Sequence, residues 1–288
     1  MLIAQLVING VLLGGVLALS ALGFNIIFGV MRVVNLAHGD FVVLSAVFCA
    51  FVFAQSNINP LFLLPLTAIA GFLFGAVVHR YLLRRLPGEI AKAEASSLTL
   101  TFGLSFLLAG AGLAVFGGNY RSVPYLTGAY HVAGLSIPQA RLLAFGSALV
   151  LAALLGLFLR FTAIGRAIRA TSQDVEGALA CGIDADRVRT ISFALGTAVA
   201  TAAGALMSFI YNLNPQMGVL FTINAFAIVV IGGLGNYAGT IAGAVVLGLA
   251  QSFTSYFAGA TLSEAAPYVL FILVSLFLPS GILGRRAT

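Results

Sequence analysis

The chain has 288 residues, of which 61% are hydrophobic and only 8% are charged. Soluble domains carry about 25% charged residues, so this composition excludes an ordinary water-soluble domain of this size. The formal net charge of +6 does not indicate nucleic-acid binding, because the arginines lie in a few short loops between apolar runs. The composition instead fits a chain that has lipid as its solvent, and its 33 glycines suit close helix packing in a bilayer.

Apolar runs long enough for helices follow one another along the chain. A membrane span needs about 20 mostly apolar residues. The runs cover residues 3–29, 41–55, 61–83, 97–116, 142–160, 190–211, 222–257 and 265–283. These eight segments predict an all-α polytopic transmembrane helical bundle that forms a single domain over residues 1–288. We interpret the first run as a retained span rather than a signal peptide, because no positively charged stretch precedes it.

The loops between the runs differ sharply in charge. Arginine and lysine concentrate in the 79–94 loop, in the 160–189 loop and in the tail residues Arg285 and Arg286. The loops near 56–60 and 212–221 carry no charge. Because short cytoplasmic loops retain Lys and Arg, the first group should be cytoplasmic and the second external. Parity of the spans then places the N-terminus and the 117–141 loop outside, and a bacterial inner membrane is the simplest setting.

The first polar feature lies between the first two apolar runs and includes Asn35, His38 and Asp40. Ionisable groups near membrane depth are costly, so they usually pair with one another or line an aqueous path. Two alternatives remain open: Asp40 could simply cap the second span, and His38 could be an interfacial residue. We take these three residues, together with Asn25 of the preceding run, as candidates for the lining of a substrate path.

The longest polar segment, about 161–189, has the features of a docking helix. Ser172 is a plausible N-cap, and Asp174 and Glu176 follow in the first turn, where the helix dipole favours acids. Gly182 stands where a helix would end in a left-handed cap, and Asp184 could cap the next span. One face of the predicted helix is apolar and consists of Val175, Ala178, Leu179 and Gly182. Such a face with flanking arginines suits a groove on a partner protein, and a merely solvated loop is the alternative.

The 222–257 run must enter the membrane and return, because the loops on both of its sides are predicted to be external. Its middle is rich in glycine and contains Gly232, Gly233, Gly235 and Asn236. Irregular backbone at membrane depth is tolerated only where protein or a water-filled cavity satisfies it. We therefore expect this break to face the bundle interior or the cytoplasmic mouth, and its four residues join the candidates for the substrate path.

Small residues at a spacing of four predict tight helix packing. Two rows have this spacing, Gly235, Gly239 and Gly243 in one and Gly196, Ala200 and Gly204 in the other. Small side chains at this spacing let helix backbones approach each other in a bilayer. Both rows are scaffold features and do not identify a substrate.

Several function classes lack the residues they need. The sequence has no G-x-x-x-x-G-K-[ST] phosphate loop, so the chain is not expected to hydrolyse ATP itself. No Glu or Lys lies deep within a predicted span, which leaves little for a proton-coupled or sodium-coupled mechanism. Neither cysteine has metal-ligand spacing, and a membrane-depth Ser/His dyad would have to use His38. We expect no catalytic residue, no bound metal or cofactor and no nucleic-acid partner; a self-contained secondary transporter or channel is the rival class.

Three blocks of sequence together resemble the permease subunits of branched-chain amino-acid ABC importers. The first block is Phe24–Phe41, the second runs from Gly165 to Gly182, and the third is Ile231–Asn236 followed by Gly239. They occur in the family's order and extend over essentially the whole chain. Asp40 departs from the family pattern, in which we expect Glu at this position. The negative charge is preserved, because Asp is also a carboxylate.

The resemblance implies a heteromeric importer that works by alternating access. Its other parts would be a second related permease, cytoplasmic subunits that bind and use ATP, and a periplasmic substrate-binding protein. The resemblance assigns coupling to the ATPase to Gly165, Arg166, Arg169, Asp174, Val175, Ala178, Leu179 and Gly182. Branched-chain or related amino acids are the implied substrates, and related permeases for urea, short amides or sugars are the alternative within the wider group.

Overall fold

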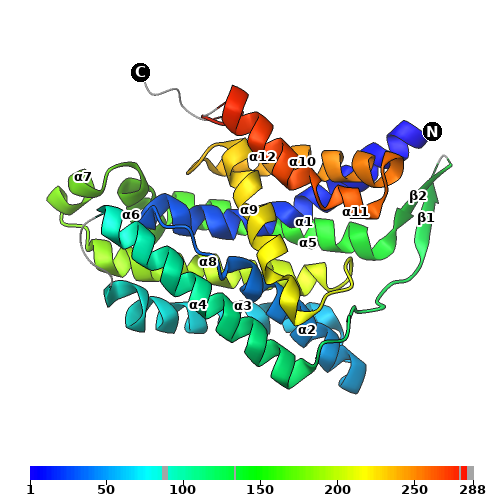
Figure 1. The fold of residues 1–288 in the computed structure, drawn as a ribbon, viewed down its shortest axis with the longest axis horizontal. Helices are drawn as coiled ribbons and strands as arrows, with labels where there is room; N and C mark the ends of the chain where they lie inside the picture. Colours follow the sequence, from blue (N-terminus) through cyan, green and yellow to red (C-terminus); the bar gives the residue numbers. More distant parts are fainter. Residues whose placement is uncertain (86–89, 133, 279, 284–288) are drawn as a thin grey trace.

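The computed structural model describes residues 1–85, 90–132, 134–278 and 280–283, with the backbone alone for 90–94. The predicted cytoplasmic residues Arg285 and Arg286, and the side chain of Lys92, lie outside this description. Within it, nine helices are long and apolar enough to cross a membrane. The prediction of a polytopic helical bundle is therefore confirmed, and Figure 1 shows most of the long helices running side by side.

The spanning helices in chain order are α1 (Leu2–Met31), α2 (His38–Ser56), α3 (Pro60–Tyr81), α4 (Ile90–Phe116), α5 (Gln139–Phe161), α8 (Ala185–Met207), α9 (Gly218–Gly232), α10 (Tyr237–Phe257) and α12 (Ala266–Phe277). The short helices are α6 (Ala163–Gln173), α7 (Val175–Ala180) and α11 (Ala260–Ser263), with 3₁₀ turns at Leu83–Arg85 and Pro215–Met217. The eight predicted runs become nine spans because 222–257 divides into α9 and α10, as the glycine break predicted.

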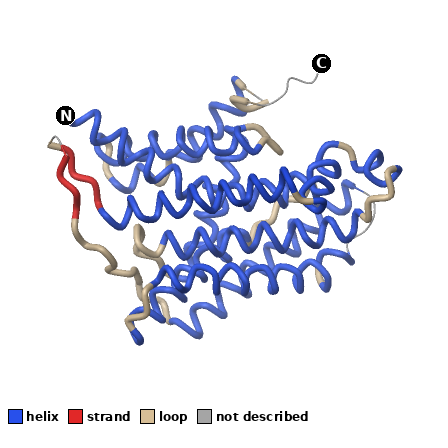
Figure 2. Tube along the Cα trace, turned by 180° about the vertical axis from the view of Figure 1, so that it is seen from behind, coloured by secondary structure: helices blue, strands red, loops and turns tan. Residues whose placement is uncertain are grey.

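One element was not predicted, an antiparallel hairpin of β1 (Ala129–Val132) and β2 (Leu135–Pro138). It lies beside the N-terminus at the opposite end of the bundle from α6 and α7 (Figure 2). Gln5 holds it there, because the side-chain amide donates to the Ser136 carbonyl at 2.7 Å and accepts from the Ser136 N–H at 2.9 Å. We call this the outer end, and the end with α6 and α7 the arginine-rich end.

α1 is the central helix of the bundle. Every residue from 16 to 27 is buried, and the helix packs against α5, α8, α9 and α10. Glycines permit the closest approaches: a Cβ on Gly23 would meet the backbone of α8 near Ala200, and one on Gly14 would meet the backbone of α10 at Val245. The row Gly196, Ala200 and Gly204 packs α8 against α1 and α2, as predicted.

The second small-residue row is only partly a packing row. Gly239 and Gly243 lie against the backbone of α9 near Gly232. Gly235 instead has a φ of +76° in the turn before α10, and no atom lies within 4 Å of its ideal Cβ position. A left-handed turn residue therefore replaces the third packing contact, because the helix starts only at Tyr237.

Candidate functional site

The chain between α1 and α2 folds back into the bundle after Met31, and α2 begins inside the bundle (Figure 1). His38, its first residue, is completely buried beside the middle of α1. Its Nε2 lies 3.1 Å from the Ser20 carbonyl oxygen and donates a hydrogen bond to it. The imidazole ring also contacts the Phe24 ring edge-on, with 5.2 Å between the ring centroids. His38 is thus an internal contact between two spans and not an interfacial residue.

A second contact ties the start of α2 to α9. The Gly39 N–H donates to the Thr222 hydroxyl at 2.8 Å, and that hydroxyl donates to the Leu36 carbonyl at 2.9 Å. Asn35 closes the turn locally, because its side-chain oxygen accepts from the Ala37 N–H at 3.1 Å. These bonds make residues 35–39 a junction inside the bundle, beside the middle of α1.

Asp40 lies in the first turn of α2, where a carboxylate is favoured by the helix dipole. It is only 2% exposed and lies beside Ser105 of α4 and Gly218 of α9. Its Oδ2 has no hydrogen-bond partner among the described residues. The structure therefore places Asp40 with Asn35 and His38 in the closed centre of the bundle.

The remaining path candidates lie around a cavity of about 660 Å³ at the arginine-rich end, which we call the inner cavity. Asn25, Gly235 and Asn236 line it. The Asn25 side-chain oxygen accepts from the Gly235 N–H at 2.9 Å. Asn236 caps α10 by accepting from the Gly239 N–H at 3.0 Å, and its amide donates to the Leu283 carbonyl at 2.6 Å. Both asparagines line the cavity and use their amides to shape the turn.

Gly232 and Gly233 are buried and do not line the inner cavity. Gly232 packs against the backbone of Gly239, where a side chain would collide. Gly233 ends α9 with a φ of 103°, a conformation that favours glycine. The glycine break therefore faces the cavity through its residues 234–237, and Gly232 and Gly233 form the α9–α10 contact and the turn.

The predicted docking segment contains two helices in place of one. The Thr162 hydroxyl caps α6 by accepting from the Gly165 N–H at 2.9 Å, and α6 continues through Ser172. The prediction of Ser172 as N-cap is wrong, because its hydroxyl donates to the Arg169 carbonyl inside α6. Asp174 has an extended backbone, with a φ of −148°, and it separates the end of α6 from the start of α7.

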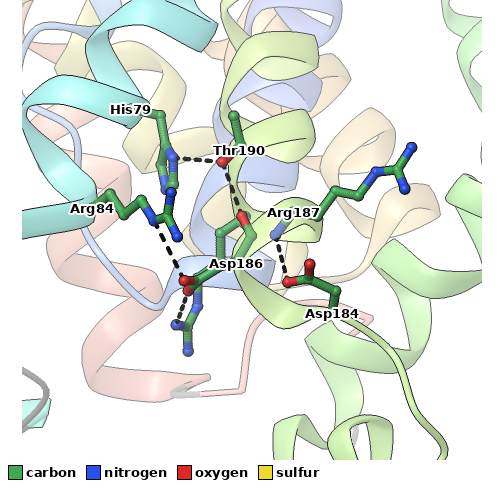
Figure 3. Close-up of polar contacts among 7 residues, drawn as sticks. His79, Arg84, Asp184, Asp186, Arg187 and Thr190 are labelled. Carbon is green, nitrogen blue, oxygen red and sulfur yellow. Dashed lines mark hydrogen bonds and ion pairs between the residues drawn. The ribbon is translucent and has the colours of Figure 1, made fainter.

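The end of the docking segment follows the prediction. Gly182 has a φ of +78° after α7, and the Ile183 N–H donates back to the Ala178 carbonyl at 3.0 Å. Asp184 caps α8 by accepting from the Arg187 N–H at 3.0 Å (Figure 3). Arg84 and Arg189 each lie 3.5 Å from the Asp186 carboxylate; the Arg84 pair joins the start of α8 to the 3₁₀ turn after α3, and the Arg189 pair lies within α8.

The predicted apolar stripe of α7 is divided. Ala178 is 4% exposed and faces the protein, Val175 is half-buried, and Leu179 is 54% exposed. The reason is that α7 packs against the rest of the protein mainly through Ala178, so the opposite side of the helix is exposed. Leu179 and the exposed Gly182 are then the part of the stripe that is open to a partner.

The other predicted coupling residues lie in α6. Gly165 packs against the backbone of Leu159, where a Cβ would come within 2.5 Å of the Leu159 Cα, so it allows α6 to fold back closely on α5. Arg166 donates to the Phe161 carbonyl at 3.2 Å and Arg169 to the Arg160 carbonyl at 3.4 Å. Both guanidinium groups thus cover the end of α5.

The structure also contains a cavity of about 500 Å³ at the outer end, which the sequence did not predict and which we call the outer cavity. It lies between α1, the start of α5, the 210–217 segment, α9, α10 and α11. Its main polar lining consists of Asn9, Arg141, Tyr211, Asn224, Gln251 and Glu264. The available signal was weak: Arg141 and Glu264 are isolated charges in loops predicted to be external.

Known proteins match the chain along nearly its whole length. High-affinity branched-chain amino acid transport system permease protein LivH of Escherichia coli (strain K12) is 30% identical, over 98% of this chain and 95% of that protein. BraD of Pseudomonas aeruginosa, a permease protein of the same description, is 29% identical over the same shares. Among solved structures, PsaBC from Streptococcus pneumoniae in complex with Fab has a TM-score of 0.51 and 13% identity, and covers 94% of this chain and 91% of that one. That likeness concerns the fold alone.

A family match agrees with these relatives. Residues 6–277 match the family described as "Branched-chain amino acid transport system / permease component". This range includes the central junction, both cavities and the docking segment. The chain therefore belongs to the family of permease components of branched-chain amino acid transport systems.

Proposed function

We propose that this chain is the permease subunit of an inner-membrane ATP-binding-cassette importer and carries branched-chain or related amino acids by alternating access. The observation that carries the proposal is the family match over residues 6–277. A polytopic bundle with a cavity at each end and a closed centre has the form that such a mechanism needs.

The coupling role falls to the docking segment of α6 and α7. Its exposed Leu179 extends from the arginine-rich end, where positive charge marks the cytoplasmic side. A partner ATPase that closes on ATP would push this segment, and α6 would transmit the movement to α1 and α8, which it contacts. ATP is used by the partner in this scheme and is not bound by the chain.

The proposed substrate path begins at the outer cavity, passes the junction at His38 and ends at the inner cavity. All three lie along α1, since Asn9, Ser20 and Asn25 belong to the outer, central and inner parts in turn. Transport would require the junction of residues 35–39 to open toward one cavity at a time. A periplasmic binding protein would deliver the substrate to the outer end, and a second related permease would complete the membrane part.

The test is purification of a tagged copy of the chain from its native membrane in mild detergent, followed by identification of the co-purifying proteins. We expect an ATPase and a second hydrophobic permease, and neither in a parallel purification of an unrelated polytopic protein from the same membrane. The purified complex should take up leucine into liposomes only when ATP is supplied. Recovery of the chain alone, competent for uptake without ATP, would refute the importer in favour of a secondary transporter or channel.

A further inference from the structure

The outer cavity holds one charge of each sign. Arg141, in the first turn of α5, and Glu264, which follows α11, are the charged residues in its described lining. Neither forms an ion pair with any residue that the structure describes. Tyr211 lies in the same lining, where burial raises the pKa of its hydroxyl to about 12, Arg141 lowers that pKa and Glu264 raises it. Two opposite charges thus share a cavity without neutralising each other.

The same cavity contains polar atoms that lack partners. The side-chain oxygens of Asn9 and Asn224 are buried, and neither has a hydrogen-bond partner in the described part of the chain. The Asn224 side chain belongs to α9 and is only 5% exposed. A buried acceptor without a donor costs free energy, so most such atoms in proteins are satisfied. Both oxygens are closed off from solvent, so their residues belong to the tightly packed part of the lining.

The apolar part of the wall includes Leu6, Leu13, Leu220 and Phe221. A volume of about 500 Å³ lies within the usual range of small-molecule sites, about 300–1,000 Å³. The cavity therefore combines a cation, an anion and an apolar wall. A molecule complementary to all three has a carboxylate, an ammonium group and an aliphatic side chain.

We propose that the outer cavity is a binding site in this permease for a zwitterionic α-amino acid with an aliphatic side chain. Arg141 pairs with the carboxylate and Glu264 with the ammonium group, and the side chains of Asn9 and Asn224 complete the polar lining. The apolar wall receives the side chain. This inference rests on the proposed function and assigns to the permease itself a part of the selectivity.

The position of the site fits a step before translocation. Residues 16–27 of α1 are all buried, so they separate this cavity from the inner one. The sixteen residues from Asn9 to Asn25 correspond to about 24 Å along a helix. An amino acid in the outer cavity would be held on the outer side of the closed junction until the helices move.

The experiment measures binding of radiolabelled leucine to the assembled membrane complex in lipid nanodiscs, without the periplasmic protein. Two competitors each lack one charged group: isopentylamine has no carboxylate, and 4-methylpentanoate has no ammonium. We expect leucine to bind the wild-type complex about tenfold more tightly than isopentylamine, because Arg141 is half-buried, and about threefold more tightly than 4-methylpentanoate, because Glu264 is exposed and water screens its charge.

The variants Arg141→Gln and Glu264→Gln should lose different parts of this preference. Arg141→Gln should weaken leucine about tenfold and leave isopentylamine unchanged. Glu264→Gln should weaken leucine about threefold, because Glu264 is exposed, and leave 4-methylpentanoate unchanged. A structural defect would weaken the binding of all three ligands by the same factor. The ratio of leucine affinity to each competitor's affinity therefore separates a loss of recognition from structural damage. Arg187→Gln is the matched control, because its side chain is exposed at the arginine-rich end and it should change no ratio.

Three outcomes would overturn the proposal: no saturable leucine binding to the wild-type complex, full leucine preference in both variants, or weakening of all three ligands alike. A fourth would do so by another route, namely variants that lose only association with the periplasmic protein, since Arg141 and Glu264 would then be docking contacts. ATP-driven leucine uptake by the wild-type complex separates the two hypotheses. If the complete importer takes up leucine but the variants leave the ratios of leucine affinity to competitor affinity unchanged, the binding site alone is refuted. If the complete importer takes up no leucine, the proposed function is refuted.

Discussion

The two cavities of the bundle differ in the kind of charge they present. The outer cavity is lined by one arginine and one glutamate, and it contains buried amide oxygens without partners among the described residues. The inner cavity is lined by Arg32, Arg160 and Arg169, with no carboxylate in its described lining, and its asparagines are occupied by backbone contacts. One end is therefore equipped to hold a zwitterion, and the other is not.

This difference suggests how one bundle can bind a substrate on one side and release it on the other. A site that offers partners to both charged ends of an amino acid favours its capture. A cavity whose asparagine oxygens already accept hydrogen bonds and whose charged side chains are all positive has no anion in its described lining to bind the ammonium group. The asymmetry would give the path a direction even before the ATPase acts, and the following variants test it.

The largest expected effect is on the junction that separates the cavities. In Gly39→Val the new side chain would come within 2.5 Å of the Thr222 backbone nitrogen, and neither backbone can move easily. Overpacking of this kind costs about 3 kcal/mol, so we expect a large fall in the melting temperature of the purified complex. Gly103→Val is the control, since no described atom outside its own stretch of helix lies within 4 Å of that Cβ position. Equal melting temperatures for both variants would show that the junction is not a rigid wall.

The next effect concerns the arginine-rich end as the docking side. Leu179→Asp places a charge on the exposed side of α7 and should weaken association with the ATPase about tenfold or more, because an apolar contact at the centre of an interface often contributes over 1 kcal/mol. Val132→Asp is a matched control in β1, since the two side chains are 54% and 59% exposed. Pull-down of the ATPase measures both. Intact association in Leu179→Asp would refute the coupling role of this face.

The same amide substitution at the two cavities should have opposite consequences. Asn25→Ala removes the acceptor of the Gly235 N–H and should cost about 1–2 kcal/mol of stability, with the leucine preference retained. Asn224→Ala removes an acceptor that has no partner in the described structure, so stability should hardly change and leucine binding should weaken. Thermal unfolding and ligand competition on both variants measure the two effects. A selectivity change in Asn25→Ala would remove the distinction between the cavities.

The helices and several local turns could be predicted from the sequence, because each depends on neighbouring residues. The 222–257 run was expected to turn back since glycines interrupt it between two external loops, and the structure has α9 and α10 there. Gly182 and Asp184 likewise cap their helices as predicted. The Ser172 cap failed because α6 extends ten residues from Ala163, and a competing cap at Thr162 starts it earlier.

The candidate path was harder to predict, because a polar residue within an apolar run gives the same sequence pattern whether it lines a cavity or is buried in a closed contact between helices. His38 and Asp40 are polar at membrane depth, as expected, and the structure places both in the closed centre. The outer cavity could not be found at all. Asn9, Arg141 and Glu264 lie far apart in the sequence, and only the packing of α1, α5 and α11 brings them to one space.

The smallest expected effect is that of Arg160→Gln at the inner cavity, the counterpart of Arg141→Gln at the outer one. Arg160 is exposed at the end of α5, where salt and water screen its charge, so leucine binding should change by less than about twofold. The measurement is the same competition with isopentylamine and 4-methylpentanoate. A loss of leucine preference as large as that expected for Arg141→Gln would mean that the inner arginines also recognise the carboxylate. The two cavities would then be alternative sites for one substrate, and the direction of transport would have to come from the ATPase alone.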